Sequence, residues 1–212
     1  MAALDLEEQE QLDALKAWWK ENGNRLLGAL LMVVVAMGGW RGWQYYQQEQ
    51  SGEAATLYAE FTKQLDSGDA KRVNDVAAIM MGQYAASGYA PRAALLAAQV
   101  NEQVNELARA RTQLQWVIEH AAEDGLKDVA RLRLAAVLLD EKNYTEAMKL
   151  LEAKHPASFD GLYADLRGDV LSAQGKNEEA RSAYKLAYEK TEAKGMYRSL
   201  IQVKMDALGE AK

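Results

Sequence analysis

The longest apolar stretch of the chain runs from Leu26 to Trp40 and carries no charge between Arg25 and Arg41. Its 15 residues would rise only about 22 Å as a helix, less than the roughly 30 Å hydrocarbon core of a bilayer. The uncharged stretch alone is therefore too short to establish a membrane span.

Aromatic residues on both sides extend this stretch. Trp18 and Trp19 precede it, and Trp40, Trp43 and two tyrosines lie at its end. Trp19 to Trp40 would cover about 31 Å as a helix, and aromatic belts at both interfaces are typical of membrane-spanning helices. The arginines can reach the headgroups from inside these limits. We predict one span over residues 25–46, with these anchoring residues: Trp18, Trp19, Arg25, Trp40, Arg41 and Trp43.

Two other interpretations of the apolar stretch stay open at this point. Residues 26–37, followed by the small residues around Ala36 and Gly38, also resemble the end of a cleaved signal peptide. The preceding residues 1–24 carry six acidic side chains against two lysines, whereas a signal peptide begins with a short positive segment. A buried core helix would leave the flanking aromatic pairs without a role. We favour an uncleaved span.

The orientation of the span follows from the basic residues near its ends. Lys16, Lys20 and Arg25 precede the apolar stretch, while only Arg41 follows it before Lys63. Because basic residues stay on the cytoplasmic side, the sequence predicts a cytoplasmic leader over residues 1–24. The remaining domain, residues 47–212, is then expected on the other side of the membrane, which in bacteria is the periplasm.

The leader itself has an apolar face with helical spacing, made by Leu4, Leu12, Leu15 and Trp19. We expect a short interfacial helix that ends at residues 22–24, where Asn-Gly-Asn breaks the pattern. Two roles remain open for it. The leader could dock a cytosolic protein, or it could serve only to set the topology of the span.

Beyond the span the periodicity is helical throughout. Ala54, Tyr58, Phe61 and Leu65 form one apolar stripe, and turn residues recur at regular intervals with no strand-like alternation. Ala, Leu, Glu, Gln and Lys, which favour helices, are abundant. The sequence predicts an all-α protein in which one N-terminal transmembrane helix precedes a helical domain.

An internal repeat indicates the architecture of this domain. The pattern over residues 134–151 recurs 33 residues later over 167–184. Small residues align in both copies, with Ala135 matching Gly168 and Ala147 matching Ala180. Small residues on both helices of a pair allow close antiparallel packing, which is the tetratricopeptide signature. We therefore predict a solenoid of helical hairpins.

Further helices flank the two clear repeats. A weaker repeat covers residues 97–117, where Asn101 stands in place of a large apolar residue. Residues 53–65 and 69–86 are expected to form a pair before it. Residues 192–208 are expected to form a terminal capping helix, because the last repeat of a solenoid needs a cover.

Composition and charge narrow the function. The 212 residues carry a net charge of -6, which argues against nucleic-acid binding. The chain has no Cys, and its two His residues, 35 positions apart, lack partners at metal-ligand spacing. No nucleophile, base and acid occur in a credible catalytic order. The sequence thus predicts a non-enzyme with no catalytic, metal or cofactor site.

A helical solenoid can instead offer a groove to a protein partner. In the tetratricopeptide register the first helix of each hairpin lines the concave side, with an apolar centre and polar ends. Packing of Leu132 and Leu139 on a neighbouring helix is the alternative explanation for the apolar centre. The predicted protein-binding groove consists of Arg92, Leu95, Gln99, Leu132, Ala136, Leu139, Leu162, Asp165 and Asp169.

Several segments together resemble the YfgM family, the ancillary subunits of the SecYEG translocon. The resemblance rests on the acidic leader ending in residues 18–23, Gly-Trp-Arg at 39–41, and the block 164–168 that continues into 175–183. It implies a single-pass inner-membrane protein of Gram-negative bacteria with a periplasmic tetratricopeptide-like domain. It also implies partnership with SecYEG and with the membrane-anchored chaperone PpiD, and no catalytic motif.

Three functions follow as hypotheses. The first is a membrane-tethered interaction module that helps to pass secreted proteins from the translocon to periplasmic chaperones. The second is a regulator whose leader holds a cytosolic protein at the lipid bilayer. The third is a scaffold for cell-envelope assemblies. Partners recovered with and without residues 1–24 would distinguish them.

Overall fold

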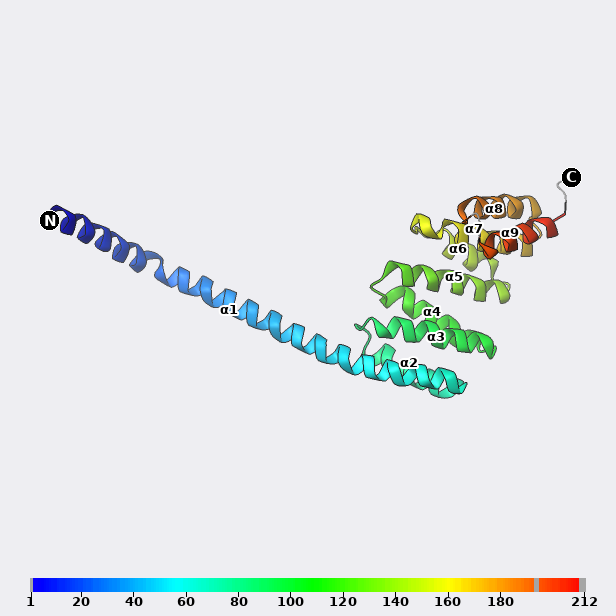
Figure 1. The fold of residues 1–212 in the computed structure, drawn as a ribbon, viewed down its shortest axis with the longest axis horizontal. Coiled ribbons are helices and arrows are strands. Elements are labelled where there is room, and N and C mark those ends of the chain that lie inside the picture. Colours follow the sequence, from blue (N-terminus) through cyan, green and yellow to red (C-terminus); the bar gives the residue numbers. More distant parts are fainter. Residues whose placement is uncertain (1, 193–194, 210–212) are drawn as a thin grey trace. The chain divides into compact units, whose positions relative to one another are not determined.

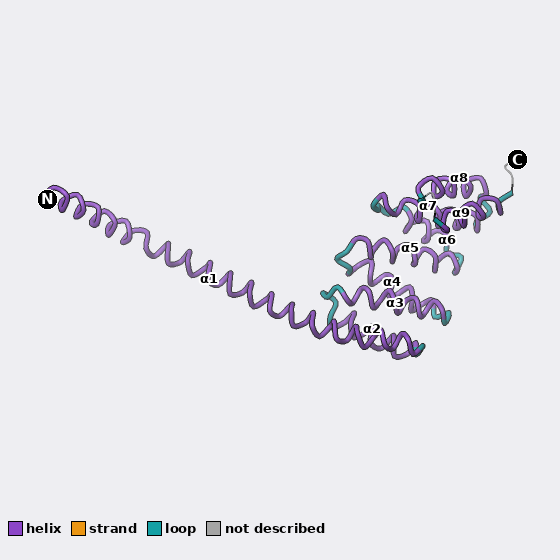
Figure 2. The backbone as a smooth tube through the Cα atoms, in the orientation of Figure 1, coloured by secondary structure: helices purple, strands orange, loops and turns teal. Residues whose placement is uncertain are grey.

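The computed structural model describes residues 2–192 and 195–209 (Figure 1). Within these residues the chain consists of helices and connecting loops, with no strand (Figure 2). The predicted all-α class is therefore confirmed. The chain divides into two compact units, residues 1–50 and 51–212.

The first unit is part of a single helix, α1, which runs from Ala2 to Ser67 and continues into the second unit. The break that we predicted at residues 22–24 is wrong, because α1 is continuous there. Asn22 donates a side-chain hydrogen bond to the Trp18 carbonyl within the helix. The cost of one glycine in a helix, about 1 kcal/mol, is too small to end it.

The apolar stretch of α1 packs on nothing within its own unit. An 18-residue window of α1 has a mean hydropathy of 1.5, and none of it is buried. Leu26 is 43% exposed and Trp40 is 66% exposed. Among the described residues, α1 is the one helix that is long and apolar enough to cross a membrane. The exposure of its apolar side chains is the opposite of what a core helix shows.

The second unit begins with the last residues of α1 and continues through eight further α-helices among the described residues. In chain order these are α2 (Ala70–Gln83), α3 (Tyr89–Gln103), α4 (Leu107–His120), α5 (Asp124–Asp140), α6 (Tyr144–Leu151), the 3-10 helix η1 (Ala157–Phe159), α7 (Asp160–Ala173), α8 (Asn177–Lys190) and α9 (Met196–Ala207).

These helices form successive hairpins that stack on one another (Figure 1). The end of α1 pairs with α2, α3 with α4, α5 with α6, and α7 with α8. The last helix, α9, packs against α8 and has no second helix of its own among the described residues. First helices of adjacent hairpins also touch, as α5 and α7 do. The predicted first pair and the terminal helix are therefore confirmed.

Small residues set the spacing within these hairpins. Gly168 on α7 lies so close to Tyr184 on α8 that a Cβ atom there would overlap the tyrosine ring. Ala135 and Ala147, which occupy the matching positions of the previous hairpin, are fully buried. The aligned small residues of the repeat thus lie where the sequence pattern placed them, in the contact between paired helices.

The irregular first repeat has a polar centre. Asn101 is fully buried and exchanges two hydrogen bonds of 2.8 Å with Asn74, each side chain donating one. Asn101 also donates to Gln113 at 2.7 Å, and Gln113 donates to Asn74. This amide cluster joins α2, α3 and α4. Asn101 departs from the apolar pattern because its partners satisfy its polar atoms, as buried amides require.

Candidate protein-binding surface

The middle of the predicted groove lies on α5. Leu132, Ala136 and Leu139 are all partly exposed on one side of this helix. Leu132 and Leu139 also pack against the core shared by α3 to α7. Both explanations of their apolar character thus hold in part, since one side of each leucine supports the core and the other reaches solvent.

The α3 end of the predicted groove is polar and held by an ion pair. Arg92 donates to the Glu123 carboxylate from Nη2, at 2.8 and 3.0 Å, and so ties α3 to the start of α5. Gln99 is exposed, whereas Leu95 is only 8% exposed and belongs to the core. Of the three predicted residues on α3, Arg92 and Gln99 are accessible to a partner.

The α7 end is largely occupied by the chain itself. Leu162 is 39% exposed, but Asp165 is buried and accepts hydrogen bonds from Tyr197 at 2.7 Å and Lys204 at 2.8 Å. Asp169 accepts from Lys204 at 2.8 Å. Both donors to Asp165 belong to α9. The two carboxylates therefore hold the last helix in place, and only Leu162 of this trio is exposed.

The same contacts change the acidity of the α9 side chains. Burial lowers the pKa of Lys204, but its hydrogen bonds to Asp165 and Asp169, together with their charges, outweigh burial and raise the pKa overall. Burial raises the pKa of the Tyr197 hydroxyl, and the bond to Asp165 raises it further. At neutral pH the cluster therefore contains a charged lysine and a neutral tyrosine.

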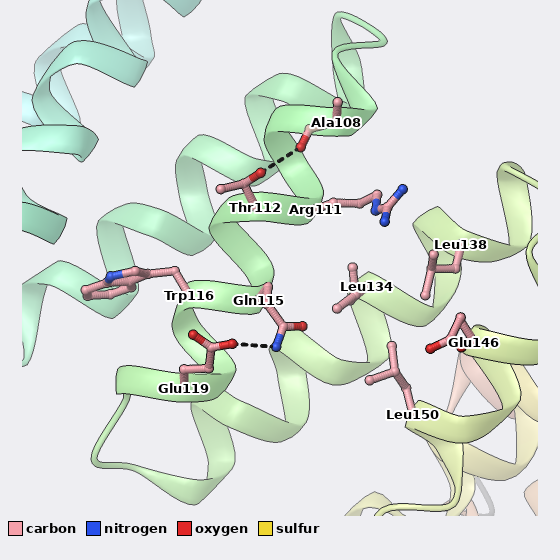
Figure 3. A pocket seen from close by; sticks show the side chains of 10 residues that line it. All are labelled: Ala108, Arg111, Thr112, Gln115, Trp116, Glu119, Leu134, Leu138, Glu146 and Leu150. Carbon is pink, nitrogen blue, oxygen red and sulfur yellow. Dashed lines mark hydrogen bonds between the residues drawn. The ribbon is translucent and has the colours of Figure 1, made fainter.

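A hollow lies on the side of α5 that carries Leu134 and Leu138 (Figure 3). It has a volume of about 630 Å³ and lies between α4 and α6, with Leu134 and Leu138 of α5 in its floor. Helical residues are rotated by about 100° each, so these two leucines project roughly opposite to Leu132 and Leu139. The hollow is thus separate from the predicted groove.

The hollow combines an apolar floor with a polar rim. Leu150 of α6 faces Leu134 across it, while Gln115 and Glu119 of α4 are joined by a hydrogen bond of 2.8 Å (Figure 3). The full set of lining residues is Ala108, Arg111, Thr112, Gln115, Trp116, Glu119, Leu134, Leu138, Glu146 and Leu150. The sequence prediction missed this surface because it considered only the first helices of the hairpins.

A second hollow, of about 750 Å³, lies between α2 and α4 and shares Ala108, Thr112 and Trp116 with the first. Trp116 stacks on His120, with ring centroids 4.5 Å apart. The sequence offered one indication of these surfaces, namely Trp116. It is a tryptophan far from the predicted span, and it lies near the end of the weaker repeat, residues 97–117.

The histidines are engaged in local contacts. His155 stacks on Tyr163 at 3.9 Å, and its Nδ1 lies 3.6 Å from Asp160. Among the side chains that the structure describes, no group of three His, Asp or Glu residues is placed to hold a metal ion. Both histidines thus make local contacts within the helical domain.

Comparison with known proteins gives the same fold. The family described as "Tetratricopeptide repeat-like domain" matches residues 16–210. The likeness therefore covers most of α1 and all of the described hairpins.

Several curated proteins are similar over nearly the whole chain. The "Ancillary SecYEG translocon subunit" of Neisseria gonorrhoeae is 31% identical over 97% of this chain and 99% of that protein. The protein of the same name from Escherichia coli is 30% identical, over 95% of this chain and 96% of its own length. Another with that name, from Haemophilus influenzae, is 28% identical over 88% and 91%, respectively.

The stacked hairpins, with small residues at each helix contact, define a tetratricopeptide-like helical repeat protein. They are preceded by α1, which among the described residues is the one helix long and apolar enough to cross a membrane. With this architecture and this full-length similarity, the chain belongs to the family of ancillary SecYEG translocon subunits.

Proposed function

We propose that this chain is an ancillary subunit of a SecYEG translocon and acts as an interaction module held at the membrane by α1. The observation that carries the proposal is near-full-length similarity to proteins of that name, which includes both the apolar helix and the repeat domain. A non-enzymatic role agrees with this family name and with the repeat fold.

The proposed arrangement has residues 1–24 in the cytoplasm, residues 25–46 in the inner membrane and residues 47–212 in the periplasm. The basic residues Lys16, Lys20 and Arg25 support this orientation. Tethering supplies the physical advantage, because a domain held near the channel exit has a high effective concentration there. Weak contacts with emerging polypeptides are then sufficient for function.

The proposed contact surface is the accessible part of the predicted groove. Leu132, Ala136 and Leu139 provide its apolar centre, Leu162 extends it on α7, and Arg92 with Gln99 provides a polar end. We place Leu95, Asp165 and Asp169 beneath this surface as supporting residues. The proposed occupants are segments of secreted proteins on their way to periplasmic chaperones, including a PpiD-type chaperone anchored in the same membrane.

Photocrosslinking in living cells tests this proposal. A photoreactive residue at Leu132, Leu139 or Leu162 of the full chain is expected to form adducts with translocon subunits and with a periplasmic chaperone. The matched control is Lys185, which is exposed on α8 outside the groove. Absence of both adducts from all three groove positions, or equal adducts from Lys185, would contradict the proposal.

A second candidate function is regulation through the leader. Leu12, Leu15 and Trp19 are each about half exposed on α1, so this segment presents apolar side chains that a cytosolic protein could bind. Deletion of residues 2–15, which keeps Lys16, Lys20 and the two tryptophans at the start of the span, separates the two functions. Under the first proposal the groove adducts persist in the deletion variant, whereas under the second a cytosolic protein is released from the membrane fraction.

A further inference from the structure

The last described helix, α9, occupies the position of the first helix of a hairpin, and no second helix follows it among the described residues. Tyr197 of α9 donates its hydroxyl proton to Asp165 of α7, just as Tyr163 of α7 donates to Asp128 of α5. The two tyrosines are 34 residues apart and make the same contact with the preceding first helix. This shared contact aligns the two helices, so that each residue of α7 corresponds to the residue 34 positions later on α9.

This register identifies the side of α9 where a second helix would pack. Gly161 of α7 lies against Thr191, which follows the last residue of α8, and Gly168 lies against Tyr184 in the middle of α8. Ala164 belongs to the same core cluster as the α8 alanines. The corresponding α9 residues, 34 positions later, are Gly195, Arg198 and Gln202.

A hollow is present at that position. It has a volume of about 690 Å³ and is lined by Tyr188 of α8 with Gly195, Met196, Arg198, Ser199, Gln202 and Val203 of α9. All three register positions are therefore among its lining residues. Ile201, on the other side of α9, is fully buried against the preceding hairpin. The hollow thus faces away from the part of the domain that α9 covers.

The outer surface of α9 is not that of an ordinary cap. Met196 is 90% exposed, Leu200 50% and Val203 62%, and their spacing places them in one stripe along the helix. A terminal helix that only closes a solenoid presents a polar outer face, because an apolar one promotes association. This stripe, of which Met196 and Val203 also line the hollow, therefore indicates a binding surface.

The charge in the hollow specifies the partner further. Arg198 is the one charged residue among its lining residues, and its guanidinium lies 3.9 Å from the centre of the Tyr188 ring. This stacking, with a hydrogen bond of 3.4 Å from Nη1 to the Thr191 carbonyl, fixes the arginine at the edge of the hollow, where an acidic partner would balance its charge. A complementary helix would therefore carry an apolar face for Met196 and Val203 and an acidic residue for Arg198.

We propose that the outer face of α9 binds one amphipathic, acidic helix of another protein, which takes the place of the second helix of a fifth hairpin. Such a helix would bury the exposed stripe. It would pack less closely than α8 packs on α7, because Arg198 and Gln202 stand where α7 has Ala164 and Gly168. The proposal does not depend on the groove at Leu132, and its failure would leave the groove crosslinks unaffected.

The test uses the full chain in living cells, with a photoreactive residue at Ser199 or Gln202. We expect adducts with one partner protein from both positions. Mass spectrometry should place the attached partner residues three or four positions apart in one segment that has an apolar face and an acidic residue. Adducts with a second copy of this chain or with lipid, scattered partner sites, or no adduct would overturn the proposal.

Two variants test the hollow itself. Ser199→Trp fills it from an exposed position, and Arg198→Glu reverses its charge; each is expected to lower the adduct yield from Gln202 at least tenfold. Ser182→Trp, at an exposed position of α8, is the matched control and should leave the yield unchanged. A yield that Ser199→Trp does not reduce would overturn the proposal, even if Arg198→Glu impairs folding.

Discussion

The ring of Tyr184 lies directly against Gly168, in the space that a side chain at position 168 would need. Tyr184 is almost completely buried and donates a hydrogen bond to Asp169 at 2.8 Å, so its ring is held from both ends. This contact joins α7 to α8 in the repeat that the sequence pattern defines most clearly.

Gly168→Ala is therefore expected to destabilise the repeat domain. The added methyl group would force the ring of Tyr184 or the helix to move, and overpacking of this kind costs about 1–3 kcal/mol. Chemical denaturation of the full chain in detergent, followed by near-ultraviolet circular dichroism, measures the loss. The control is Gly125→Ala on α5, where a Cβ atom meets open space and stability should stay equal or rise. An unchanged midpoint for Gly168→Ala would contradict the contact.

Asn101→Leu restores the apolar residue of the repeat pattern, and we expect it to lower stability. The substitution leaves buried polar atoms of Asn74 and Gln113 without their partner, which costs roughly 1–3 kcal/mol. The triple variant with Asn74→Leu and Gln113→Leu removes all three amides and should recover part of the loss. The same denaturation measurement applies, and a single variant as stable as the parent would show that the amide cluster is not needed.

The stability of the domain should fall between about pH 10 and pH 12. Burial, with the hydrogen bond to Asp128 and its charge, raises the pKa of Tyr163 to about 12. Because the folded state holds this proton more tightly, the stabilisation is complete below the unfolded pKa of about 10 and is lost as the pH rises through 12. The loss for this group is about 2–3 kcal/mol.

Thermal unfolding at several pH values measures this dependence. Tyr163→Phe should be less stable at neutral pH and flatter above pH 10, because it has no proton to lose. Tyr89→Phe is the matched control, since Tyr89 is 37% exposed. A Tyr163→Phe profile as steep as that of the unchanged chain would contradict the assignment.

Charges in the middle of the apolar stretch should release the chain from the membrane. Val33→Asp combined with Val34→Asp adds about 5–7 kcal/mol to the cost of insertion, since one acidic residue at a helix centre costs about 2.5–3.5 kcal/mol. Carbonate extraction of membranes measures the retained fraction. Val33→Leu with Val34→Leu should remain in the pellet, and an equally retained acidic variant would argue against a span at this position.

Several elements could be predicted because their signals lie within a few turns of helix. The repeat helices were predicted from apolar periodicity and turn residues. The pairing of α7 with α8 was predicted because Gly168 and Ala180 align with Ala135 and Ala147 of the previous repeat. The terminal helix followed from the need to cover the last repeat. The break at residues 22–24 was predicted wrongly, because turn-favouring residues are only weak signals inside a long helix.

The amino-acid sequence by itself determined the helices, the repeat and the apolar stretch, since these depend on residues that are close together along the chain. Only the tertiary structure decided which polar groups stay free. Asp165 has an exposed position in the repeat pattern, yet Lys204, 39 residues later, neutralises and covers it. Asn101 likewise finds Asn74 across 27 residues. The energy of a buried charge or amide depends on partners that folding brings together, and no local pattern contains them.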